Sequence, residues 1–149
     1  MIAITLLRIA GLLLLLLAAL NLYLPKRFDW ASELPRLSLL NRQIMVVHAG
    51  FIVFILLLMS AFSLALPHDL MSPSRLSRAL LAAMSLFWFV RLLVQWFVYD
   101  SRIWRGHRFY TVMHYVFTAL WCYFAGTYGF ALWQNLSTSL PSWYQIVRL

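Results

Sequence analysis

Long runs of apolar residues, separated by short polar and basic stretches, dominate the chain. A membrane-spanning helix needs about 20 mostly apolar residues, because each residue adds only 1.5 Å to its length. Four runs reach this length and predict membrane-spanning helices over residues 2–24, 44–66, 79–99 and 109–133. The sequence therefore predicts an all-α integral membrane protein, folded as one four-helix bundle domain over residues 1–149.

Turn and capping residues mark the ends of these runs. Pro67 ends the second run, and Ser72-Pro73-Ser74 precedes the third. A serine cap followed by proline at the first helical position predicts that the third helix begins in this loop. After the fourth run, residues 141–148 combine Trp, Tyr, Val and Arg, a mixture that predicts a short segment lying on the membrane surface.

The composition excludes the other structural classes. Hydrophobic residues make up 64% of the chain and charged residues 11%, whereas a soluble domain has roughly 25% charged residues. A soluble fold of this length cannot bury so much apolar surface, and a disordered chain would contain fewer aromatic residues. One alternative stays open for the first run, which could be a cleaved signal peptide because Arg8 precedes its apolar core.

The basic residues predict the orientation in the membrane. The net charge is +8, and seven Lys and Arg residues lie in the stretches 25–42 and 100–108, against three at 75, 78 and 148 on the opposite side. The positive-inside rule then places 25–42 and 100–108 in the cytoplasm and both termini outside, as expected in a bacterial cytoplasmic (inner) membrane. Anionic lipid headgroups are the expected partners, whereas no extramembrane stretch is long enough to bind nucleic acid.

Polar and ionisable residues gather in the cytoplasmic half of the predicted bundle. Arg91, Gln95 and Tyr99 share one face of the third span at helical spacing. In the fourth span, a face with a period of three and four residues carries His107 and His114, and His48 lies at similar predicted depth in the second span. An ionisable group inside a span is a candidate functional group. The predicted intramembrane cluster comprises His48, Arg91, Gln95, Tyr99, Asp100, His107 and His114.

This cluster has a structural and a chemical interpretation. Arg91 could simply reach the interface or hold the bundle in register, and the histidines could be hydrogen-bonded packing residues. Alternatively, His48 and His114 could be the axial ligands of a b-type haem, or the pocket could hold a quinone or a sterol-like lipid. A metal site is not expected, because His107 and His114 lie about 10 Å apart on one helix.

Complete catalytic motifs are absent from the sequence, so no catalytic residue is predicted. The spans contain no carboxylate, which excludes di-iron chemistry of the bundle type. Cys122 is the single cysteine, so an intrachain disulfide is excluded as well.

The third span ends in the stretch Gln95-Trp96-Phe97-Val98-Tyr99. This stretch, with the chain length and the four spans, resembles the small scaffold protein of the eukaryotic sterol-demethylation complex. The chain is also similar to small four-span membrane proteins of bacteria. The first resemblance implies a protein that tethers membrane enzymes without being a catalyst itself.

The sequence thus favours a non-catalytic accessory or scaffold subunit that acts on other membrane proteins or self-associates, with lipid binding as an added property. The rival interpretation is a membrane redox or lipid-modifying protein that uses a haem, quinone or lipid pocket at His48, His114 and Arg91.

Overall fold

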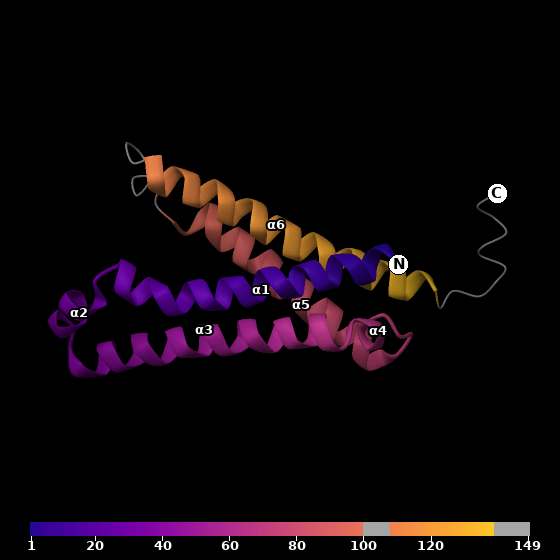
Figure 1. The fold of residues 1–149 in the computed structure, drawn as a ribbon, viewed down its shortest axis with the longest axis horizontal. Helices are drawn as coiled ribbons and strands as arrows, with labels where there is room; N and C mark the ends of the chain where they lie inside the picture. The colour runs from indigo at the N-terminus through magenta and orange to yellow at the C-terminus, as the bar shows by residue number, and fades with distance from the viewer. Residues whose placement is uncertain (100–107, 139–149) are drawn as a thin grey trace. The chain divides into compact units, whose positions relative to one another are not determined.

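A computed structural model describes residues 1–99 and 108–138 of the chain, and every regular element in these two ranges is a helix. The all-α class predicted from the sequence is therefore confirmed for this part of the chain. The elements in chain order, labelled in Figure 1, are α1 (Ile2–Arg27), α2 (Trp30–Glu33), the 3-10 helix η1 (Leu34–Arg36), α3 (Leu39–Ala65), α4 (Pro67–Leu70), α5 (Arg75–Phe97) and α6 (Arg108–Ser137).

Three helices of the described ranges, α1, α3 and α5, are long and apolar enough to cross a membrane. They match the first three predicted spans to within a few residues. With 30 residues, α6 is long enough as well, but its tyrosine, threonine and histidine side chains make it less apolar than the other three.

Serine caps explain where two of the long helices begin. The Oγ atom of Ser38 accepts a hydrogen bond from the backbone N–H of Asn41, so α3 starts five residues before the apolar run that predicted it. Ser74 caps α5 in the same way through the N–H of Ser77, at 3.1 Å. Pro73 therefore precedes the cap, and the expectation that it occupies the first helical position was wrong. The predicted surface segment 141–148 lies outside the described residues.

The chain divides into two compact units. One unit contains residues 8–66, and the other contains residues 1–7 together with the chain from Pro67 onward. The single bundle domain stays a prediction, and the two units are described separately below.

Within the unit of residues 8–66, α1 and α3 approach closely at Gly11. The hydroxyl of Ser60 donates a buried hydrogen bond of 2.8 Å to the carbonyl oxygen of Gly11. A Cβ atom at position 11 would meet the Cγ of Leu64 at 2.6 Å and the Cβ of Ser63 at 3.1 Å. Small residues at a helix crossing let two backbones approach in a membrane protein, and Gly11 has this role.

Replacing Gly11 with valine should destabilise the protein by about 1–3 kcal/mol, because the added carbons overlap Leu64 unless the two helices move apart. Thermal unfolding in detergent, followed by tryptophan fluorescence, measures the change. The matched control is Gly50→Val in α3, where a Cβ atom would meet nothing within 4 Å. Equal melting temperatures for the two variants would contradict this role of Gly11.

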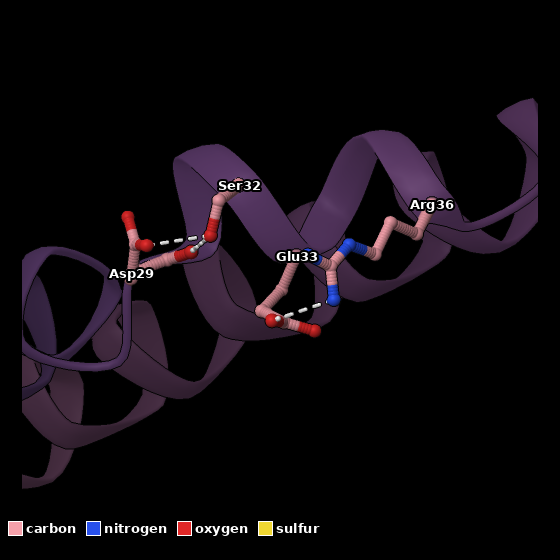
Figure 2. Close-up of polar contacts among 4 residues, drawn as sticks. All are labelled: Asp29, Ser32, Glu33 and Arg36. Atoms are coloured by element: carbon pink, nitrogen blue, oxygen red, sulfur yellow. Dashed lines mark hydrogen bonds and ion pairs between the residues drawn. The ribbon is translucent and has the colours of Figure 1, made fainter.

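The connection between α1 and α3 contains short helical turns held by local polar contacts (Figure 2). Asp29 has a left-handed backbone conformation, with φ of 49°, and its carboxylate and carbonyl both accept hydrogen bonds from the hydroxyl of Ser32. One turn further, Nη1 of Arg36 lies 3.3 Å from Oε1 of Glu33. Both partners of this ion pair are largely exposed, so the pair contributes little stability by itself. These contacts fix the conformation of the connection between α1 and α3.

In the other unit, α5 and α6 form an antiparallel helical hairpin (Figure 1). Aromatic side chains fill the space between the two helices. Trp88 of α5 stacks on Trp121 of α6 with ring centroids 5.0 Å apart, and Phe124 lies 4.6 Å from Trp88. All three residues are buried. About one turn away, Gly129 lies against Ser85, whose hydroxyl donates to the carbonyl of Ala125.

Candidate functional site

Gln95 is the centre of a polar network between α5 and α6. Its side chain is buried, with 6% of its surface exposed. Its Oε1 accepts hydrogen bonds from Nε1 of Trp121 at 3.3 Å and from Nη1 of Arg91 at 3.4 Å. Its Nε2 lies 2.9 Å from Nδ1 of His114. One amide thus joins three side chains from two helices, Arg91 among them.

The partners of Gln95 also define the orientation of its amide. Arginine and the tryptophan indole are donors only, so the amide oxygen must face Arg91 and Trp121. The NH₂ group then faces His114 and donates to its Nδ1 atom. Because a neutral imidazole has one donor and one acceptor nitrogen, this contact places the proton of His114 on Nε2. The tautomer is assigned from the hydrogen-bond network.

The guanidinium of Arg91 lies among aromatic rings. Its Cζ atom is 4.9 Å from the centroid of the Trp121 ring and 5.7 Å from that of Tyr99. These distances are typical of cation–π contacts, which stabilise a partly desolvated charge. Arg91 is half-buried, and its side chain extends toward the carboxyl end of α5. The four predicted residues Arg91, Gln95, Tyr99 and His114 are thus brought together.

The other predicted site residues belong to the unit of residues 8–66 or lie outside the described residues. His48 belongs to the unit of residues 8–66, is exposed, and contacts the carbonyl of Ile44 on its own helix through Nδ1 at 2.9 Å. Because α3 begins at Leu39, His48 lies further into its helix than the predicted span places it. Its pairing with His114 stays a prediction. Asp100 and His107 lie outside the described residues.

Within the described residues, one face of α6 carries polar and aromatic side chains that lie against α5. His114 and Trp121 contact Gln95, and Tyr128 is fully buried. The hydroxyl of Thr118 donates to the carbonyl of His114 within the helix. Within residues 1–99 and 108–138, no group of three or more His, Cys, Asp or Glu side chains could hold a metal ion.

A second polar cluster, around Asn135 near the end of α6, was missed by the sequence analysis. Asn135 is fully buried, and its Nδ2 donates to the carbonyl oxygens of Leu70 and Ser72 at 3.1 and 2.7 Å. Its Oδ1 accepts from Nε of Arg78 at 3.1 Å. Its Nδ2 also lies 3.3 Å from the hydroxyl of Ser77. The amide therefore ties α6 to the turn between α4 and α5.

One signal in the sequence could have indicated this cluster. Asn135 follows the predicted fourth span by two residues, and a buried polar side chain mostly bonds to the backbone or to water.

No protein-family model, curated protein or solved structure matches this chain.

Proposed function

We propose that this protein is a four-span integral membrane protein that acts as a non-catalytic accessory or scaffold subunit for another membrane protein. In this proposal α6 crosses the membrane as a fourth span, in addition to α1, α3 and α5. Two of its polar side chains, His114 and Trp121, lie against α5, so these groups do not need to face lipid.

The observation that carries the proposal is the hydrogen bonding of Gln95. Arg91, His114 and Trp121 are the polar groups that a cofactor or substrate would use, and each contacts the same buried amide. A histidine that ligates a metal through Nε2 must have that nitrogen unprotonated, and its Nδ1 then donates to a second group. The contact with Gln95 favours the opposite tautomer of His114. The network is therefore better suited to holding two helices together than to binding haem iron.

The lipid-facing surface supports a role in association. The apolar helix α3 exposes Phe51 and Phe54 in its middle. Gly50 lies beside them on an exposed part of the helix, and a Cβ atom there would meet nothing within 4 Å. Exposed glycine in a membrane helix allows another helix to approach its backbone closely. This surface is where we expect the partner to bind.

Site-specific photo-crosslinking tests the proposal. With benzoylphenylalanine in place of Phe51 or Phe54, irradiation of native membranes should give one discrete product that contains a second membrane protein. The same probe in place of Leu56, which is 3% exposed, should give none. Gly50→Leu should reduce the product without lowering the melting temperature. Products with lipid alone, or with a second copy of this chain alone, would contradict an accessory role.

A redox or lipid-modifying role is the second candidate, because Arg91, Tyr99 and His114 do converge around Gln95. In this role His48 and His114 would ligate a b-type haem, or a quinone or lipid would occupy the site. An absorption spectrum of the protein purified from its native membrane separates the two proposals. A Soret band that is lost in both His48→Ala and His114→Ala would favour the second candidate.

We also propose that both termini lie outside the cytoplasm, in a bacterial inner membrane, on the evidence of the basic residues between α1 and α3. In a Cys122→Ser background, a cysteine replacing exposed Leu37 should react with a membrane-impermeant maleimide only after the membrane is opened. A cysteine replacing Leu76, at the start of α5, should react in intact cells with a permeable outer membrane. The reverse pattern would show that the orientation is wrong.

A further inference from the structure

One face of α5 lines an open, apolar hollow of about 420 Å³. Its lining residues recur every three or four positions, so they lie on the same side of the helix. Several of them are exposed, including Phe87 and Val90. The lining residues are Ala83, Leu86, Phe87, Val90, Arg91 and Val94.

Arg91 stands at one end of this almost wholly apolar hollow. The other lining residues are apolar. The guanidinium of Arg91 extends past them toward Tyr99, a residue that follows the end of α5. Within the described ranges, no carboxylate lies at ion-pair distance from Arg91. The contacts with Trp121 and Tyr99 leave the positive charge in place, because aromatic rings do not neutralise it. A ligand of matching chemistry has an anionic head and an apolar tail.

The length of the hollow matches one leaflet of a bilayer. From Ala83 to Val94 the helix rises about 16 Å, at 1.5 Å per residue. The hydrocarbon core of a bilayer is about 30 Å thick, so one leaflet contributes about 15 Å. An acyl chain lying along this face would therefore reach from the membrane interface to about the midplane.

We propose that this face of α5 binds one anionic phospholipid, with its phosphate on the guanidinium of Arg91 and an acyl chain along Val94, Val90, Phe87 and Ala83. This lipid site is separate from the surface of α3 that we propose for the partner protein, since it lies on α5. The net charge of +8 favours the same class of lipid.

Native mass spectrometry of the full chain, titrated with phosphatidylglycerol or phosphatidylcholine in detergent, tests the proposal. We expect one phosphatidylglycerol to bind at least about fivefold more tightly than phosphatidylcholine, the preference that one basic residue near the membrane surface gives. Arg91→Gln should remove this preference. The matched control is Arg75→Gln, which removes the same charge from an exposed position at the other end of α5 and should leave the preference unchanged.

A second variant tests the hollow without touching the charge. Ala83→Phe fills the apolar end and should weaken binding of both lipids, whereas Arg91→Lys keeps the charge and should retain the preference for phosphatidylglycerol. The proposal is overturned if Ala83→Phe binds as the wild type does, or if Arg75→Gln loses as much preference as Arg91→Gln. The proposal is also overturned if a quinone or phosphatidylcholine binds more tightly than phosphatidylglycerol. If Arg91→Gln does not fold, the Ala83→Phe and Arg91→Lys results decide.

Discussion

Replacing Asn135 with leucine should lower the free energy of unfolding by about 2–3 kcal/mol, because a buried carbonyl and a half-buried guanidinium lose their partners. The carbonyl of Leu70 loses an N–H donor at 3.1 Å, and Nε of Arg78 loses its acceptor at the same distance. The carbonyl of Ser72 is less affected, since it also accepts from the hydroxyl of Ser77. The turn between α4 and α5 should then separate from α6.

Thermal unfolding in detergent measures this effect, and Asn41→Leu is its control. Asn41 is an exposed asparagine in the first turn of α3, so the same change there removes no buried contact. A melting temperature of Asn135→Leu equal to that of Asn41→Leu would show that the cluster contributes nothing to stability. Arg78→Gln should give a smaller loss than Asn135→Leu, because Asn135 keeps its bonds to the loop carbonyls.

The second large effect is expected at Gln95. Gln95→Leu keeps the size and apolar packing of the side chain but removes the amide that joins Arg91, His114 and Trp121. The indole N–H of Trp121 is buried, with 5% of the residue exposed, so the loss of its acceptor costs about 1–3 kcal/mol. Arg91 loses its hydrogen bond as well, and within the described residues it retains its contacts with the aromatic rings.

A matched set of variants distinguishes the contribution of the amide oxygen to stability from that of the NH₂ group. Gln95→Glu keeps an oxygen for Arg91 and Trp121 but removes the NH₂ group that faces His114. We expect it to be more stable than Gln95→Leu, since two of the three contacts remain. Gln43→Leu, at an exposed position of α3, controls for the change of side chain. If Gln95→Leu and Gln43→Leu unfold at the same temperature, the amide does not hold α5 to α6.

The structure explains why the long helices were predicted and the short ones were not. Apolar runs of about 20 residues have few alternatives to a membrane helix, so α1, α3 and α5 follow directly from the sequence. The turns α2 and η1 contain four and three residues and depend on local contacts such as Ser32 with Asp29. No periodicity marks so short an element.

The candidate site was predictable where its residues share a helix. Arg91 and Gln95 are four residues apart, so their contact follows from helical spacing alone. The sequence placed Gln95 and His114 in one cluster, but it did not predict their direct contact, because that contact depends on the register of α5 against α6. Asn135 was missed for a different reason, since two of its partners are backbone carbonyls that no residue type reveals. Likewise, Gly11 is visible in the sequence, whereas its contact with Leu64 is not.

The accessory role is tested most directly by native mass spectrometry of the protein extracted from its own membrane in a mild detergent. An accessory role predicts an assembly in which this chain and a second, different membrane protein occur in a fixed ratio, and in which Gly50→Leu lowers the share of the assembled form. A chain found alone, or only in multiples of itself, would contradict the account.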